Sequence, residues 1–149
     1  MTAVKSACVE EAVSRFNEGY NCAQSVLLAM QKFWEIENPL EPKAASAFGG
    51  GIGRRGSLCG ALTGGVIAIG LRYGTNTPSS RTREQAYSMA LEFYERFEKE
   101  CGSVLCRDIG YDLTNPEELE AARSADAFRR KCVNFIGKAV EALIDTESV

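Results

Sequence analysis

Hydrophobic residues recur at three- and four-residue steps along most of the chain, which is the period of an amphipathic helix. Val9, Val13 and Phe16 form one such series, and a second runs from Ala23 to Trp34. In Arg81–Cys101 the apolar residues fall on one face and the charged residues mostly elsewhere. No alternating pattern is long enough for a strand, so the sequence predicts an all-α fold.

The segment Leu58–Leu71 is apolar on all sides and carries glycines at a spacing close to one helical turn. Its 14 residues are fewer than the roughly 20 that a membrane-spanning helix needs. The flanking arginines, Arg72 and the pair Arg54–Arg55, are the feature that favours the membrane alternative. We expect a buried, glycine-rich central helix whose glycines let neighbouring helices approach closely, and no membrane insertion.

The C-terminal third also has helix signals. Asn115 followed by Pro116 is a typical helix start, because asparagine caps the first turn and proline fits its first position. A further helix is expected from about Ser124 to Ile144, with a break near Cys132. Loops are expected at residues 37–42, 48–56 and 73–80. With 149 residues, the chain has the length of one domain, and we predict a single helical bundle over residues 1–149.

The amino-acid composition limits the kinds of chemistry that the protein can perform. The formal net charge of −3 argues against nucleic acid or an anionic membrane as the main partner. The chain has no histidine, which excludes mechanisms that need an imidazole base or ligand. It has six cysteines, so sulfur is the best candidate for its chemistry.

The first residues contain no apolar stretch of the kind found in secretory signals, so a cytoplasmic location is expected. Thiols are normally kept reduced there, and repeated cysteines then indicate metal binding or redox catalysis rather than static cross-links. For any single cysteine, the alternative is a small buried apolar residue. We interpret Cys8 and Cys101 in this way by default.

Three cysteines fall at predicted helix N-termini. Cys22 follows Asn21 in a capping-box pattern, while Cys59 and Cys106 follow Ser57 and Ser103 closely. Free backbone N–H groups and the helix dipole favour a thiolate at such positions. Neighbouring arginines act in the same direction, and Cys132 follows the basic run 129–131. No two cysteines have the C-x-x-C spacing, so any site must be assembled by the fold.

The segment 51–56 reads G-x-G-x-x-G, but it lacks the preceding strand and the later acidic residue of a dinucleotide site. Two interpretations remain open. One is a flexible linker before the apolar helix. The other is an electropositive pocket facing Cys59, in which Arg54, Arg55, Gly56 and Gly60 bind an anion or stabilise a thiolate.

The cysteine order resembles a known family. Cys22 in Asn21-Cys22-Ala23-Gln24-Ser25-Val26, Cys59 in Cys59-Gly60-Ala61-Leu62-Thr63-Gly64, then Cys106 and Cys132, are similar to the C_GCAxxG_C_C family. That family is grouped as redox-active largely on its four cysteines. The resemblance covers nearly the whole chain and implies that Cys22, Cys59, Cys106 and Cys132 are the catalytic candidates. Cys101, five residues before Cys106, competes with it for the third position.

The sequence is compatible with three functions. The first is a thiol oxidoreductase or electron carrier in which Cys59 attacks and Cys22 or Cys106 resolves a disulfide. The second is a binding module in which the same four cysteines hold an iron–sulfur cluster or zinc. The third is a helical interaction domain with incidental cysteines. The redox partner, a protein or a small molecule, is not defined by the sequence, and the glycine-spaced helix would also suit a homodimer.

Overall fold

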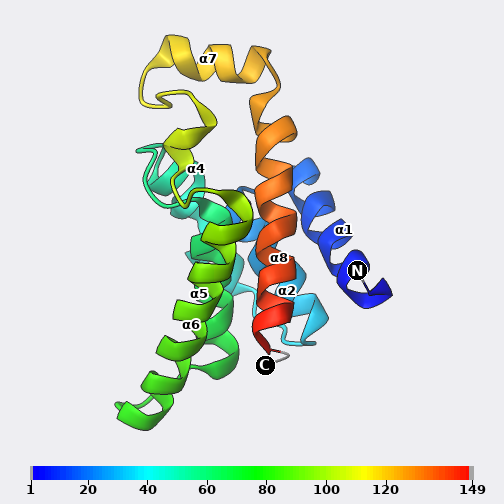
Figure 1. Cartoon of the computed structure of the whole chain (residues 1–149), viewed down its shortest axis with the longest axis vertical. Helices are drawn as coiled ribbons and strands as arrows, with labels where there is room; N and C mark the ends of the chain where they lie inside the picture. Colours follow the sequence, from blue (N-terminus) through cyan, green and yellow to red (C-terminus); the bar gives the residue numbers. More distant parts are fainter. Residues whose placement is uncertain (1, 148–149) are drawn as a thin grey trace.

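In a computed structural model, residues 2–147 are described, and they form helices without a β-strand (Figure 1). A lone antiparallel bridge joins Leu58 to Leu105. The predicted all-α fold is therefore confirmed. The helical segments, in chain order, are α1 (Ala3–Glu18), α2 (Cys22–Phe33), α3 (Leu40–Ala44), η1 (Ser46–Phe48), α4 (Gly49–Ile52), α5 (Gly60–Tyr73), α6 (Ser80–Cys101), η2 (Cys106–Ile109), α7 (Pro116–Ser124), η3 (Phe128–Cys132) and α8 (Val133–Glu147).

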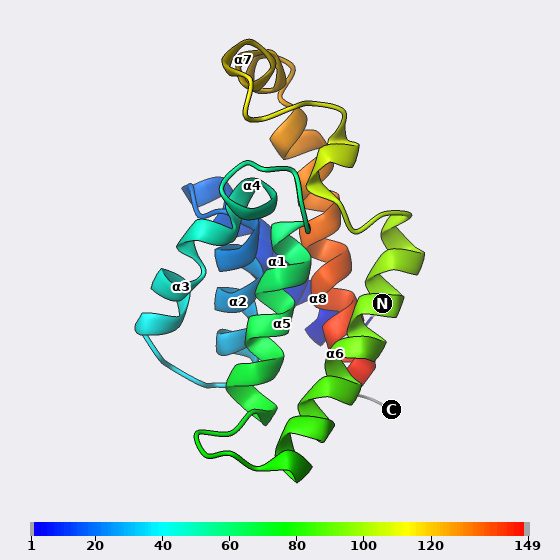
Figure 2. The same cartoon turned by 90° about the vertical axis from the view of Figure 1, so that its left-hand side faces the viewer.

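The long helices α1, α2, α5, α6 and α8 form a bundle (Figure 2). α8 packs against each of the other four, whereas α5 packs mainly against α2, α6 and α8. One side of α5 faces solvent, because Val66 is 41% exposed. The expected enclosure of the glycine-rich helix at the centre of the fold is therefore not observed.

Local sequence accounts for the helix starts. The Thr2 side chain accepts a hydrogen bond from the Lys5 N–H at the start of α1. Asn21 and Gln24 form a reciprocal capping box at the start of α2, as the sequence predicted. At α7, the Asn115 side chain accepts from the N–H groups that follow Pro116. The first residue of α2, Cys22, is thereby held in a fixed first turn.

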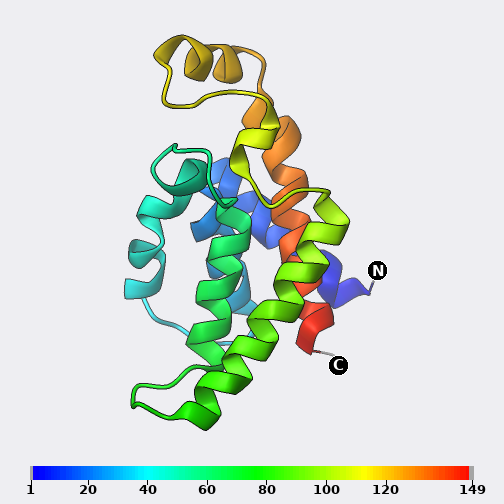
Figure 3. The ribbon, with the colours of Figure 1, turned by 60° about the vertical axis from the view of Figure 1, so that its left-hand side comes forward.

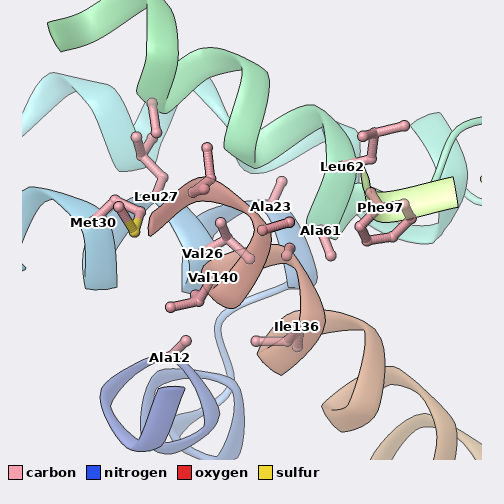
Figure 4. Packing of buried hydrophobic residues seen from close by; sticks show 14 of the residues in the cluster. Ala12, Ala23, Val26, Leu27, Met30, Ala61, Leu62, Phe97, Ile136 and Val140 are labelled. Atoms are coloured by element: carbon pink, nitrogen blue, oxygen red, sulfur yellow. The ribbon is translucent and has the colours of Figure 1, made fainter. Parts of the chain in front are cut away.

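The main core lies between these helices (Figure 4). Val26 and Leu27 of α2 and Ile136 and Val140 of α8 belong to this core, and all four are fully buried. Each such side chain contributes about 1.5–3 kcal/mol of transfer free energy. A second, much smaller cluster underlies α7 and is made of Ile109, Leu113, Ala122 and Ala127.

The glycines of α5 permit its contacts. A Cβ on Gly64 would lie 2.3 Å from the carbonyl oxygen of Ala23 in α2. A Cβ on Gly65 would lie 2.3 Å from the ring of Phe93 in α6. Real Cβ atoms do not approach so closely, so these positions bring α2 and α6 against α5. The predicted role of these glycines in close helix approach agrees with the structure.

The irregular segments differ in detail from the expected loops. The 37–42 loop contains the start of α3, and the 48–56 loop contains the short helix α4. The expected break near Cys132 is present as η3, a π-helical segment that passes directly into α8. α7 and η3 are separated by Asp126, whose φ is 54°. Within residues 2–147, no helix combines the length and the hydrophobicity needed to cross a membrane.

Replacing Gly64 by alanine is expected to destabilise the protein, because the new methyl group meets the backbone of Ala23. We expect a loss of about 3 kcal/mol in the free energy of unfolding. Gly70→Ala is the matched control, since its Cβ meets nothing within 4 Å. That variant should be unchanged or up to about 1 kcal/mol more stable. Urea denaturation of both variants measures the difference, and equal stabilities would contradict the packing argument.

Candidate functional site

Four cysteines lie where separate elements begin or end. Cys22 is the first residue of α2, Cys59 immediately precedes α5, Cys106 is the first residue of η2, and Cys132 is the last residue of η3. The electrostatic effect of Cys132, Cys59 and Cys106 reaches Cys22 and raises the pKa of its thiol. These four residues, which are far apart in the sequence, are therefore neighbours in the fold.

The most direct contact joins Cys22 and Cys132. The Cys22 thiol donates a hydrogen bond to the sulfur of Cys132, which raises the pKa of Cys22 and lowers that of Cys132. Burial also raises the pKa of Cys22, whereas the nearby ammonium group of Lys131 favours the Cys132 thiolate. Lys131 is held in place because its Nζ donates to the carbonyl oxygen of Ile109 at 2.6 Å. Of the two thiols, that of Cys132 therefore ionises first as pH rises.

The pKa of Cys59 differs from the sequence expectation. The backbone N–H groups of Ala61 and Leu62 at the start of α5 act to lower its pKa, as expected for a thiol at a helix start. Burial outweighs these donors, however, and raises the pKa of Cys59 to about 11. Cys59 is only 8% exposed. It is therefore a protonated thiol at neutral pH rather than the readiest thiolate.

Cys106 and Cys59 are held near each other by a short antiparallel pairing. The Cys59 N–H donates to the Val104 carbonyl at 2.8 Å, and the Cys106 N–H donates to the Ser57 carbonyl at 2.7 Å. Burial, with the charges of Cys59 and Cys132, raises the pKa of Cys106 to about 12. The expected caps differ, because Cys59 itself occupies the N-cap position of α5 and Leu105 that of η2.

The glycine-rich segment before Cys59 is a left-handed turn. The φ angles of residues 50–54 are 66°, 68°, 66°, 58° and 71° in order. Glycine adopts this conformation without the clash that a Cβ causes, whereas Ile52 and Arg54 are strained in it. A Cβ on Gly51 would lie 2.6 Å from the Cβ of Cys106 and 2.7 Å from the Ser57 nitrogen. The turn therefore packs against Cys106.

Two further glycines lie beside the cysteines. A Cβ on Gly60 would be 3.0 Å from the Cβ of Cys22, so glycine lets the start of α5 approach that thiol. A Cβ on Gly56 would be 3.1 Å from the Cβ of Arg107. The Arg107 Nε donates to the Gly56 carbonyl at 3.0 Å, which ties η2 to the glycine turn.

The structure separates the two arginines that the sequence grouped together. Both are exposed. Arg54 lines an open pocket together with Cys22, whereas Arg55 lines a different pocket with Asp112. The cation that lowers the pKa of Cys132 is Lys131.

The two remaining cysteines lie apart from the hydrogen-bonded pair. Cys8 is 5% exposed and packs against the Ala29 carbonyl and the Met30 sulfur, at 3.8 and 3.9 Å. Burial raises its pKa to about 11. Cys101 ends α6, and burial together with Cys59 raises its pKa to about 12. The charge of Cys106, but not that of Cys101, contributes to the raised pKa of Cys22. Cys106 is therefore the better candidate for the third position of the four-cysteine group.

A metal centre needs several ligating side chains around one point. Across residues 2–147, no group of three or more cysteine, aspartate, glutamate or histidine side chains is arranged to hold a metal ion. Structural zinc and iron–sulfur sites use four such ligands. The four cysteines as placed do not fit either centre.

Fold and site together define a helical protein with a pair of interacting thiols and two further thiols beside it. The sequence profile described as "Putative redox-active protein (C_GCAxxG_C_C)" matches residues 20–146, and the chain belongs to this family. An uncharacterized protein of Archaeoglobus fulgidus is 29% identical over 146 residues, covering 91% of this chain and 89% of that protein. No solved structure matches the chain.

Gly51→Ala should disturb both stability and Cys106, because its methyl group collides with that cysteine and with Ser57. Gly53→Ala is the matched control: its φ is also positive, but nothing lies within 4 Å of its Cβ. The control should cost about 1–2 kcal/mol for the left-handed backbone alone. Gly51→Ala should cost about 1–3 kcal/mol more. Urea denaturation with alkylation mapping of Cys106 tests this, and identical behaviour of the two variants would contradict it.

Removal of the Cys22 thiol should raise the pKa of Cys132, because the hydrogen bond from Cys22 is the largest cause that lowers it and burial opposes it. As pH rises, the Cys132 thiolate should therefore appear at a lower pH in the wild type than in Cys22→Ala. Cys22→Ser keeps a donor and should fall nearer the wild type. Ultraviolet thiolate absorbance against pH measures this, and a lower pKa in Cys22→Ala would refute the assignment.

Proposed function

We propose that the protein is a thiol redox protein in which Cys22 and Cys132 cycle between a dithiol and a disulfide. The hydrogen bond between these two thiols is the observation that carries the proposal. Two sulfurs in such contact need little movement to form a bond, and a lowered thiol pKa is typical of reactive cysteines. The family's description as redox-active is consistent with this function.

The two cysteines have different roles in this proposal. Cys22 lines an open pocket and Cys132 does not, so in this proposal Cys22 is the cysteine that reacts with an external disulfide. Cys132 is only 6% exposed, and its lowered pKa makes it the member of the pair that ionises first. It accepts the Cys22 proton and later resolves the mixed disulfide. In the sequence interpretation, Cys59 attacks; Cys59 is only 8% exposed and does not line the pocket, which favours Cys22 for this role instead.

The exchange balances without a further cofactor. The Cys22 sulfur attacks one sulfur of a substrate disulfide R–S–S–R, its proton passes to Cys132, and one R–S⁻ leaves. The Cys132 sulfur then attacks the Cys22 sulfur, and its proton passes to the second departing R–S group. The protein loses two electrons and gains a disulfide, while the substrate is reduced to one RSH and one RS⁻. The reverse reaction oxidises a dithiol substrate.

Cys59 and Cys106 support the pair in this proposal. With pKa values of about 11 and about 12, both stay protonated at neutral pH and are weak nucleophiles. Gly60 contributes by leaving room for Cys22 beside the start of α5. Four-cysteine ligation of zinc or an iron–sulfur cluster would require these sulfurs to be rearranged.

Mild oxidation of the reduced protein should link Cys22 to Cys132 with the loss of two hydrogen atoms. Peptide mapping by mass spectrometry of the unreduced protein identifies the bond. Cys22→Ser and Cys132→Ser should each abolish it. Cys8→Ser is the control, because Cys8 packs in the core away from the pair and its loss should leave the bond unchanged.

A disulfide between other cysteines, with Cys22 and Cys132 still free, would contradict the assignment of the pair. Metal and sulfide analysis of anaerobically purified protein distinguishes the ligation alternative. Stoichiometric zinc or iron, with all four thiols protected from alkylation, would overturn the exchange function.

A further inference from the structure

An open pocket of about 590 Å³ lies over Cys22. Its walls come from segments that are distant in the sequence, namely the end of α1, the left-handed glycine turn, α7 and η3. α7 lies across the end of the molecule beyond α4 (Figures 1 and 3). The pocket therefore joins the reactive thiol to side chains that no motif connects with it.

The charged side chains that line this pocket are both arginines. Arg54 comes from the glycine turn and Arg123 from α7, and no aspartate or glutamate lines the pocket with them. Arg54 forms no ion pair within residues 2–147. Arg123 has one exposed partner, Glu120, at 4.0 Å. Such a pair contributes about 0–1 kcal/mol, so Arg123 is readily available to a ligand.

The remaining walls are largely apolar. Phe16 and Phe128 are aromatic, and Leu113 and Leu119 add aliphatic surface. Small-molecule sites in proteins commonly combine apolar walls with a few charged groups that fix orientation. Arginine binds carboxylates well because its planar guanidinium donates two parallel hydrogen bonds. The molecule as a whole has a net charge of −3, so a local pair of cations is needed to attract an anion.

We propose that this pocket selects small anionic disulfides with an apolar or aromatic body. Arg54 and Arg123 bind their acidic groups, and the sulfur–sulfur bond lies against Cys22. This specificity rests on the exchange function proposed above and names its class of substrate. The reaction keeps the same balance: the disulfide takes two electrons from the Cys22–Cys132 pair and leaves as two thiol-containing products.

Three small disulfides of different charge test the proposal: dithiobis(nitrobenzoate), which is anionic, bis(hydroxyethyl) disulfide, which is neutral, and cystamine, which is cationic. For each, the rate constant for oxidation of the reduced protein is compared between the wild type and its variants. Arg54→Gln and Arg123→Gln should each lower the rate with the anionic disulfide by about tenfold. The rates with the neutral disulfide should stay within about twofold, because its contacts include no ion pair.

Arg83→Gln is the matched control. It removes the same charge from an exposed position near the start of α6, at the opposite end of the molecule from α7 (Figure 1). This variant should react like the wild type with all three disulfides. Equal losses with all three disulfides in the pocket variants, or no loss with the anionic one, would overturn the proposed specificity.

Binding without reaction separates this proposal from the redox function. The thioether thiobis(nitrobenzoate), in which one sulfur replaces the disulfide, can occupy the pocket but cannot exchange. The wild type should bind it more tightly than either arginine variant, by about tenfold, and the bound molecule should slow alkylation of Cys22. If the thioether does not bind, the pocket proposal fails. If it binds while no disulfide reacts, the pocket stands and the exchange function fails.

Discussion

The proposed chemistry of this molecule depends on the interaction between two sulfurs. The Cys22 thiol donates to the Cys132 sulfur, and this contact moves the two pKa values in opposite directions. Burial alone raises thiol pKa values, as it does at Cys8 and Cys59. The hydrogen bond reverses that effect at Cys132. The pKa of a buried thiol is therefore lowered here without histidine, by a second thiol and a lysine.

The packing of glycines keeps this contact in place. Gly64 brings α2 against α5, which fixes the helix that begins at Cys22. Gly60 lets the start of α5 approach the same cysteine, and Gly51 lets the left-handed turn approach Cys106. At each position the absent side chain sets how near two backbones can come. Precise sulfur positions thus follow from residues that carry no functional group.

Much of the fold was predictable from the sequence, because its signals are local. Helical periodicity, the Asn21–Gln24 capping box and the Asn115–Pro116 start are each read within a few residues. The four cysteines were also predicted as candidates, from helix starts and family resemblance. At Cys59 the helix start alone gave the wrong expectation. The helix dipole favours a thiolate there, but burial, which depends on the whole fold, raises the pKa of Cys59. The pairing of Cys22 with Cys132 and the contribution of Arg123 to the pocket join distant segments, and no local pattern encodes them.

The small hydrophobic cluster beneath α7 affects how readily the pocket opens. Ile109, Leu113, Ala122 and Ala127 bury far less apolar surface than the main core, so α7 can detach locally at a lower free energy than the bundle can unfold. Its Leu119 and Arg123 line the pocket, whereas Cys22 belongs to the bundle. One wall of the pocket and Cys22 thus belong to units of unequal rigidity. A molecule bound between α7 and the bundle therefore stabilises α7 against local detachment.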